Sequence, residues 1–323
     1  MDTVRRMPSK KFKKMLVLTV VLVSAALCLF VNIASEICIF CQMKGEIVSF
    51  KSYSGVFLKL PHIDCSKDPP FLIILVTSAH DQAKARMAIR ETWGKEKLVA
   101  NKRIVTYFLM GMTWGHAVED SLQDESLKYG DIMQKDFIDA YYNLTLKTMM
   151  GIEWIHKFCP QSSFVMKTDS DMFVNTNYLV KLLLKRNRNS NFVTGFLKPN
   201  ERPIRNIFSK WYVSKWEYPG DTYPPFCSGT GYVFSTDVAS QIHNIFVEVP
   251  FVKLEDVFIG LCLAKLKIKL EELHSKQTFF PDRVDFSPCR FKEIVASHFV
   301  RPHEILTYWK ELEKSENKKC PNS

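Results

Sequence analysis

The chain has 323 residues, of which 46% are hydrophobic and 24% charged, a balance that excludes collagen, low-complexity disorder and a protein crossing a membrane many times. Its net charge of +10 does not indicate nucleic-acid binding, because about half of the excess lies in residues 1–14 and the other lysines and arginines are scattered. The composition that is left after these exclusions is that of an ordinary globular protein.

The first predicted element is a membrane anchor. Residues 15–35 carry no charge and are just long enough, as a helix, to cross a hydrocarbon core of about 30 Å. The cations before this run, with Glu36 after it, keep the N-terminus in the cytosol. A cleavable signal peptide is the alternative, although its apolar region is usually shorter. We therefore expect a single-pass type II protein with a cytosolic tail (1–14), a signal-anchor (15–35), a luminal stem (36–69) and a luminal functional domain (70–323).

Cysteine use agrees with a luminal body. Eight cysteines follow the anchor, and their spacing lacks the paired CxxC motifs of a zinc site, so we expect two or three structural disulfides of unknown pairing. Cys38 and Cys41 lie at the membrane edge and could instead be acylated or bridge two chains. Asn143 begins the sequon Asn143-Leu-Thr145 and is a candidate glycosylation site.

Strands and helices alternate after Pro70. Apolar runs predict strands at 71–77, 103–111, 131–137 and 163–174, and helices are predicted at 81–94, 117–129 and 143–159. Further along the chain come aromatic loops (207–226), a strand (231–235), helices near 236–245 and 256–266, and a helix after Pro302. The alternation predicts an α/β fold with a mostly parallel central sheet flanked by helices.

Two acidic motifs are the strongest candidate functional residues. Asp169-Ser170-Asp171 follows a buried strand, at the end where ligands collect in open α/β sheets, and its carboxylates suit Mg²⁺ or Mn²⁺. An ordinary polar turn is the alternative. Glu255 and Asp256 open an apolar helix, either as favourable charges in its first turn or as a general base beside a pocket.

Weaker signals surround these two motifs. Arg86 and Arg90 share one helix face and suit a diphosphate, or they form a solvated face paired with Glu91 and Glu96. Gly229 and Gly231 precede a strand, where the backbone must approach something closely. His298 is a single imidazole, and a buried structural histidine is the more common explanation for such a residue.

Taken together, the motifs resemble the β-1,3-glycosyltransferases of the GT-A fold. The resemblance covers nearly all of residues 71–313, in order. It lies in RMAIRETWG (86–94), YGDIMQKDFIDAYYNLTLKT (129–148), FVMKTDSDMFVN (164–175), YPPFCSGTGYVFS (223–235), LEDVFIGLCL (254–263) and HFVRP (298–302). The middle serine of Asp-Ser-Asp, with FCSGTGYVFS, is similar to the β-1,3-galactosyltransferases.

The resemblance implies a Golgi membrane enzyme that uses UDP-galactose and Mn²⁺. It would add galactose in β-1,3 linkage to terminal N-acetylglucosamine or N-acetylgalactosamine on glycoproteins or glycolipids. Because the donor linkage is α and the product linkage is β, one inverting displacement suffices. A homodimer is compatible with the sequence, and a nucleic-acid partner is not expected.

The same resemblance assigns roles to individual residues. Asp256 is the expected base, with Glu255 second. Asp171 and His298 would hold Mn²⁺, and Asp169 would hold the ribose or order the loop more readily than bind the ion. The remaining residues are expected to bind the donor (Arg86, Arg90, Lys147, Asp169 and Ser170) or the acceptor (Trp211, Tyr232 and Gly229).

The sequence is also compatible with three rival functions. A transferase of the same fold could use UDP-N-acetylglucosamine instead. A non-catalytic luminal lectin or chaperone would be expected to lose an acid from one of the two pairs, and this chain retains them. A metal-dependent phosphodiesterase would typically carry more acids and histidines around two ions.

Overall fold

The structure is a computed structural model that describes residues 19, 21–29, 55–186, 189–316 and 318–320. Residues 21–29 are helical, and among the described residues no helix is both long enough and apolar enough to cross a membrane. Most of the anchor predicted at 15–35 lies outside the described residues, as do the tail, Cys38 and Cys41. From Ser54 onward the chain forms one compact unit.

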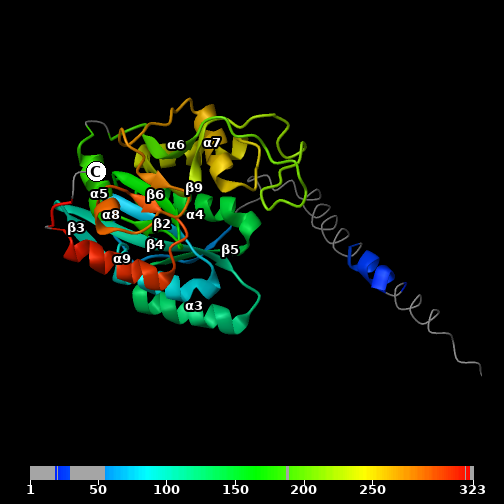
Figure 1. The fold of residues 1–323 in the computed structure, drawn as a ribbon, viewed down its shortest axis with the longest axis horizontal. Helices are drawn as coiled ribbons and strands as arrows, with labels where there is room; N and C mark the ends of the chain where they lie inside the picture. The colour runs from blue at the N-terminus through cyan, green and yellow to red at the C-terminus, as the bar shows by residue number, and fades with distance from the viewer. Residues whose placement is uncertain (1–18, 20, 30–54, 187–188, 317, 321–323) are drawn as a thin grey trace, which may run out of the picture. The chain divides into compact units, whose positions relative to one another are not determined.

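A central sheet forms the middle of this unit (Figure 1). Its strands follow the order β1-β5-β4-β2-β6-β9-β8, and β3 pairs with β4. The bounds are β1 (Phe57–Lys59), β2 (Leu72–Thr77), β3 (Lys97–Val99), β4 (Lys102–Met112), β5 (Ile132–Ile138), β6 (Phe164–Asp169), β8 (Val193–Lys198) and β9 (Phe226–Ser235).

The sheet is mixed. Strands β5, β4, β2 and β6 run parallel, as the alternating pattern predicted, whereas β1, β3 and β9 pair antiparallel with their neighbours. Strand β8 also pairs antiparallel with β9, because a loop without a crossover helix joins the two. The result is a mixed α/β fold whose parallel strands lie in the middle.

The strand predicted over 163–174 divides in two. Strand β6 ends at Asp169, Ser170 and Asp171 form a turn, and the chain then enters a small second sheet. That sheet contains β7 (Phe173–Val174), β11 (Ala296–Ser297) and β10 (Phe279–Phe280). The polar motif therefore marks the point where the chain leaves the main sheet.

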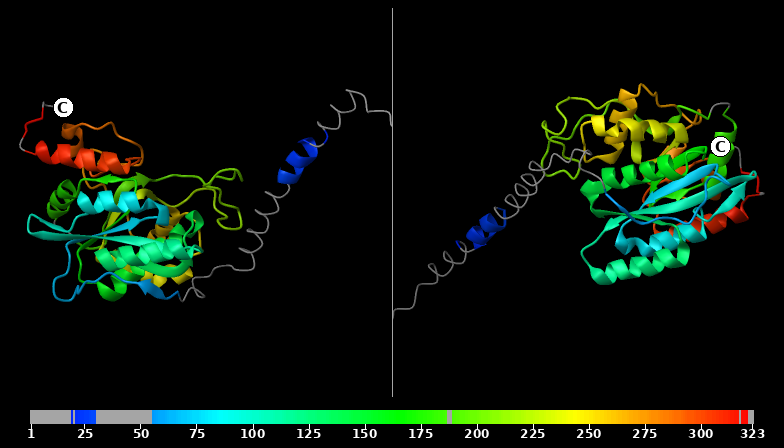
Figure 2. Two further views of the ribbon diagram at one scale, coloured as in Figure 1. Left: turned by 90° about the horizontal axis from the view of Figure 1, so that it is seen from below. Right: turned by 180° about the vertical axis from the view of Figure 1, so that it is seen from behind.

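Helices cover both faces of the sheet (Figures 1 and 2). Helix α4 packs with α6 and α7 on one face, and α2 and α9 share a large apolar cluster with residues of the other face. The helices are α2 (Ala83–Glu91), α3 (His116–Tyr129), α4 (Leu144–Phe158), α5 (Thr176–Leu184), α6 (Thr236–Ile245), α7 (Glu255–Lys265), α8 (Pro288–Lys292) and α9 (Pro302–Lys314), with 3₁₀ turns η2 (His80–Gln82), η3 (Tyr141–Asn143) and η4 (Phe246–Glu248). Elements β1, β3, α5, β8, β10, α8 and β11 were not predicted.

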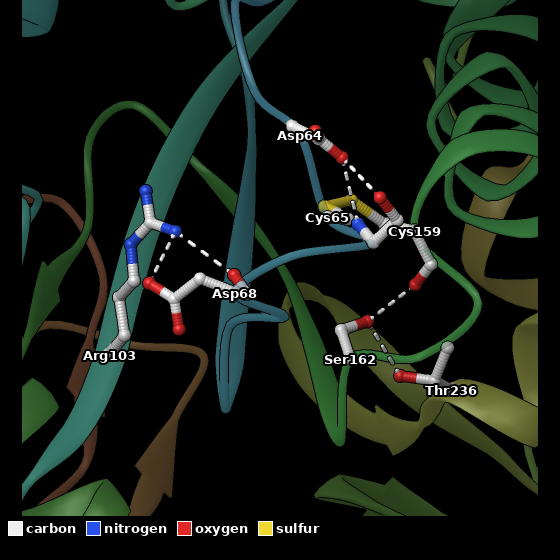
Figure 3. Close-up of a disulfide and its surroundings, with 8 residues drawn as sticks. Asp64, Cys65, Asp68, Arg103, Cys159, Ser162 and Thr236 are labelled. Carbon is white, nitrogen blue, oxygen red and sulfur yellow. Dashed lines mark hydrogen bonds and ion pairs between the residues drawn. A yellow bond between two sulfur atoms is a disulfide. The ribbon is translucent and has the colours of Figure 1, made fainter.

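Two disulfides are present among the described residues, Cys65–Cys159 and Cys289–Cys320, with Cα atoms 5.2 and 5.6 Å apart. The first joins the segment before β2 to the end of α4, and Ser162 donates a hydrogen bond to the carbonyl of Cys159 beside it (Figure 3). Cys65 and β1 both belong to the segment predicted as stem, so part of that segment is packed into the compact unit.

Candidate active site

Asp169, Asp171 and His298 come together at the carboxyl end of β6. Each offers one ligand atom, and these atoms lie within 4.8 Å of one another. The small second sheet explains the meeting, because β7 begins just after Asp171 and pairs antiparallel with β11, which ends just before His298. Three residues that the sequence singled out separately therefore form one cluster that could hold a metal ion.

The ring of His298 is oriented by its neighbours. Its Nδ1 lies 2.8 Å from the carbonyl of Pro281, and because a carbonyl only accepts, Nδ1 carries the hydrogen. Nε2 then faces Asp171, 3.2 Å from Oδ2. Burial opposes protonation, but the hydrogen bond and charge of Asp171 outweigh it and raise the pKa of His298. The imidazole is thus held with one nitrogen directed at the acidic cluster.

Lys167 connects this cluster to the second acidic motif. Its Nζ is 2.8 Å from Oδ1 of Asp169, 2.6 Å from the carbonyl of Gly229 and 3.2 Å from Oε2 of Glu255. The side chain is 2% exposed. Burial lowers its pKa, but the two carboxylates more than offset this and raise it. Asp169 Oδ1 also accepts a 2.5 Å hydrogen bond from Thr77, so this acid is anchored from two strands.

Glu255 and Asp256 occupy different environments. Glu255 is buried, and its second oxygen accepts a hydrogen bond from the Tyr232 hydroxyl. Burial raises the pKa of Glu255, and the nearby charge of Asp256 adds to this effect. Asp256 is partly exposed, and it accepts hydrogen bonds from the backbone N–H groups of Gly229 and Val257 at 3.0 and 2.9 Å. Burial of the carboxyl group raises the pKa of Asp256 as well.

Gly229 lies against both of these acids. A Cβ atom at this position would stand 3.1 Å from Oε2 of Glu255 and 3.4 Å from Cβ of Asp256. The close approach expected of this glycine is therefore to the acidic pair. Tyr232 does not match its predicted role, because it is 1% exposed and presents no open ring face to a sugar. It holds Glu255 instead.

The two arginines of α2 are held within the protein. Arg86 is 1% exposed and forms two hydrogen bonds with Glu125, at 2.8 and 2.6 Å. Arg90 pairs with both Asp131 and Glu125 at 2.7 Å. Their acidic partners come from α3 and from the residue just before β5, not from α2 and the residues after it as the alternative interpretation supposed. Direct contact of these arginines with a diphosphate stays a prediction, and the geometry gives them a structural role.

Arg86 and the third predicted donor-binding cation, Lys147, converge on the turn after β2. Lys147 donates to the carbonyl of Ser78 at 2.7 Å and to Asp139 at 2.6 Å, and Arg86 donates to the carbonyl of Ala79 at 2.6 Å. Burial lowers the pKa of Lys147, although Asp139 opposes the shift. These two cations therefore fix the shape of the turn that borders the site.

Ser170 is buried and joins that turn to the acidic motif. Its hydroxyl donates to Oε1 of Gln82 at 2.8 Å, and the same oxygen accepts from the backbone N–H of Ala79 at 2.7 Å. The predicted contact of Ser170 with a donor is not tested by this arrangement. What the structure gives is a rigid connection between the ends of β2 and β6.

Two other predicted residues lie on loops. Trp211 is 49% exposed in the loop between β8 and β9, which leaves its ring available to an acceptor. The Asn143 side-chain amide donates to the carbonyl of Ile138 at 2.7 Å, and the Thr145 hydroxyl donates to the carbonyl of Val252. Glycosylation at Asn143 stays a prediction.

Comparison with known proteins places the chain in a family. A family model described as galactosyltransferase matches residues 84–274. β-1,3-Galactosyltransferase 5 of Homo sapiens is 62% identical over 267 residues, covering 83% of this chain and 86% of that protein. Its Mus musculus counterpart is 56% identical over 309 residues, covering 96% and 98%. This chain belongs to the galactosyltransferase family.

More distant similarity was also found. β-1,3-Galactosyltransferase 2 of Mus musculus is 42% identical over 263 residues, covering 80% of this chain and 62% of that protein. The solved WbbM bifunctional glycosyltransferase, in its apo form, aligns with a TM-score of 0.37 at 12% identity over 76% of this chain and 45% of its own, a likeness too low to define the fold.

Sequence reasoning missed Lys167, Thr77 and Gln82 in this galactosyltransferase. Lys167 carried a signal that could have been used, because a lysine in an otherwise apolar strand, two residues before an acid, needs a buried partner. Thr77 ends β2 in register with Asp169, and that register follows from strand pairing alone. Gln82 lies in a short 3₁₀ turn that no periodic pattern marks.

Proposed function

We propose that this galactosyltransferase is an inverting enzyme of the GT-A type that moves galactose from UDP-galactose in β-1,3 linkage to terminal N-acetylglucosamine or N-acetylgalactosamine. The observation that carries the proposal is the pairing of two acidic sites joined by Lys167. One site can hold a metal ion, and the other presents the partly exposed carboxylate of Asp256. The names of the similar proteins support the linkage and the sugar.

The residues of the first site fit Mn²⁺. Two carboxylates and an imidazole are a donor set that this ion accepts, and the imidazole nitrogen of His298 is already directed at Asp171. Asp169 is the weaker ligand, because one of its oxygens is bound by Thr77 and Lys167. When bound, the ion would neutralise charge on the leaving diphosphate.

Asp256 acts as the base. Its position at the first turn of α7 and the N–H group of Gly229 both favour the ionised form, whereas burial keeps the carboxylate basic. The acceptor hydroxyl gives its proton to Asp256 while its oxygen bonds to C1 of galactose. The bond from C1 to UDP breaks in the same displacement, so the α linkage of the donor becomes a β linkage.

Glu255 positions the base. Its two oxygens face Tyr232 and Lys167, and the side chain is only 5% exposed, so a substrate hydroxyl has less access to it than to the partly exposed Asp256. The structure of the pair thus favours Asp256 over Glu255 for proton transfer.

The test is an assay of the purified full-length protein with a panel of UDP-sugars and acceptors. UDP-galactose with an acceptor ending in N-acetylglucosamine should give a product whose new linkage is β-1,3 by NMR. A higher kcat/KM with UDP-N-acetylglucosamine would assign the donor to the rival transferase. No transfer from any donor would support the non-catalytic rival.

We further propose that the enzyme is a type II protein of the Golgi membrane, anchored by residues 15–35. Intact mass before and after glycosidase treatment would report both an uncut N-terminus and a glycan. A mature chain beginning near Glu36 would refute the anchor.

A further inference from the structure

The loop between β8 and β9, residues 199–225, has two apolar sides. It contains turns and one isolated bridge rather than a helix or a regular strand, and it projects from the body of the molecule (Figure 2). On its inner side, Val213 and Tyr223 pack with Phe226 and with residues near α7. The outer side carries large apolar side chains that remain exposed.

The exposed set is large for one loop. Phe208 is 90% exposed, Trp216 88%, Ile207 65% and Trp211 49%. Leaving such side chains in water costs free energy in proportion to their apolar area. Exposed apolar patches of this kind mark interaction sites more often than isolated surface residues do.

The loop is internally braced, so these side chains are held outward. The Arg205 guanidinium donates to the carbonyls of Val213, Tyr218 and Gly220 at 2.8, 2.8 and 2.7 Å. The backbone N–H of Val213 also donates to the carbonyl of Ile204 at 3.0 Å. The loop therefore holds its shape through hydrogen bonds centred on Arg205, in which the side chains of Phe208 and Trp216 take no part.

The chemistry of the outer side matches a lipid surface. Exposed tryptophan, phenylalanine and isoleucine side chains near lysines are typical of segments that lie at a membrane interface. The loop has two lysines, and Lys215 is paired with Asp221. Lys210 lies over the ring of Trp211 at 4.5 Å, and no ion pair is described for it within the part of the chain that the structure covers. An anionic headgroup would complement this cation.

Two other occupants match less well. A sugar needs hydrogen-bonding groups beside a stacking ring, and Ile207 and Phe208 offer none in their side chains. A second copy of this chain would cover Trp216 with protein and not with acyl chains, and the quenching measurement below distinguishes the two cases.

We propose that the outer side of the 199–225 loop, through Ile207, Phe208 and Trp216, docks on the lipid surface in which lipid-linked acceptor glycans are displayed. The loop would thereby favour acceptors presented at a bilayer over the same glycans free in water. The kinetic part of this inference rests on the proposed transferase function.

The kinetic experiment compares one glycan in two settings. Full-length enzyme in phospholipid vesicles is assayed with the acceptor on a lipid in the same bilayer, and with the same acceptor on a short water-soluble group. The double variant Phe208→Ser/Trp216→Ser should lose about fivefold or more in kcat/KM for the lipid-linked acceptor and less than twofold for the soluble one. Trp114→Ser is the matched control, since Trp114 is 84% exposed elsewhere on the surface.

An equal loss on both acceptors would assign the loop to the glycan and overturn the proposal, as would no loss on either. A second measurement does not depend on transfer. In vesicles with brominated acyl chains and no acceptor, quenching of tryptophan fluorescence should fall in Trp216→Phe and not in Trp114→Phe. If the quenching in Trp216→Phe equals that of the wild type, Trp216 does not contact lipid and the proposal is overturned. If the wild-type protein shows the quenching but transfers galactose to neither acceptor, only the proposed transferase function is contradicted.

Discussion

The two acidic motifs of the site are built alike. In each pair the first acid is tied to Lys167, Asp169 through Oδ1 and Glu255 through Oε2, and the second acid is more open. Asp171 is 48% exposed against 31% for Asp169, and Asp256 is partly exposed against 5% for Glu255. The difference within each pair separates an acid that holds the site together from an acid that is free to meet a ligand.

The largest effect should come from the open acid of the second pair. Asp256→Asn keeps the shape of the side chain but removes its basicity, so kcat should fall by about 10²- to 10⁴-fold. Binding of UDP-galactose, measured by calorimetry, should be nearly unchanged. Glu255→Gln is the control and should be milder, because Glu255 only positions its neighbour.

If Asp256→Asn keeps more than about a tenth of the wild-type kcat, Asp256 is not the base. Losing a catalytic base should lower kcat by at least about 10²-fold. If Glu255→Gln were the inactive variant instead, the two roles would have to be exchanged.

The next prediction removes what the two pairs share. Lys167→Met should lower the free energy of unfolding by about 3 kcal/mol, because it leaves buried Glu255 without its cation. The double variant Lys167→Met/Glu255→Gln should recover part of that loss in a denaturant titration. A double variant no more stable than Lys167→Met would show that the charge of Glu255 is not what Lys167 compensates.

The first pair can be tested by metal binding alone. Asp171→Asn should weaken Mn²⁺ binding by at least about tenfold in calorimetry, and His298→Ala should weaken it by a similar factor, since each removes a ligand. Wild-type transfer that survives EDTA would contradict a metal requirement.

The smallest effect concerns Lys97, whose Nζ has no hydrogen-bond partner among the described residues and is offset only by the nearby charge of Glu313. Lys97 Nζ lies 4.2 Å above the ring of Trp309, and burial lowers the pKa of Lys97 from 10.5 to about 8. Between pH 8 and 10.5 the unfolded chain binds more protons than the folded one, so the free energy of unfolding should rise with pH across that window. Below pH 8 the whole cost of charging Lys97 is present.

Lys97→Met should flatten that rise and stabilise the protein at pH 7 by about 1 to 2 kcal/mol, less than the full pKa difference because the side chain is partly exposed. Denaturant titrations at pH 7 and pH 10 compare the two proteins. If the free energy of unfolding of Lys97→Met rises with pH as steeply as that of the wild type, Lys97 does not cause the rise.

The sequence predicted the parallel centre of the fold because long apolar runs and helical periods report burial directly. Strands β2, β4 and β5 were found within one residue at each end. The antiparallel edge strands β1 and β8 are short or only half buried, so they carry no comparable pattern. The strand predicted at 163–174 ran through the turn at Ser170 and Asp171 because apolar residues flank it on both sides, although a polar turn was one interpretation of the acidic motif.

For the site, the sequence indicated which residues carry reactive or metal-binding groups more readily than it indicated which residues they contact. Asp171 and His298 were named together only through the family resemblance, and their meeting depends on the register of two-residue strands that no pattern reveals. Arg86 was given to a ligand because its acidic partner comes from α3, a distant helix. Pairing across elements is set by the tertiary fold, which spacing along the chain does not record.

The β7–β11 ladder has a consequence for the order in which this protein matures. Asp171 is synthesised near the middle of the chain, and His298 follows only after β8, β9, α6 and α7. A nascent chain that has not yet extended past His298 therefore lacks the complete metal-binding cluster, however well its central sheet has formed. The Cys289–Cys320 bond closes around that same late segment, so oxidation of the last cysteine comes after the cluster can assemble. An active molecule is therefore one in which the C-terminal region has been synthesised, folded and oxidised.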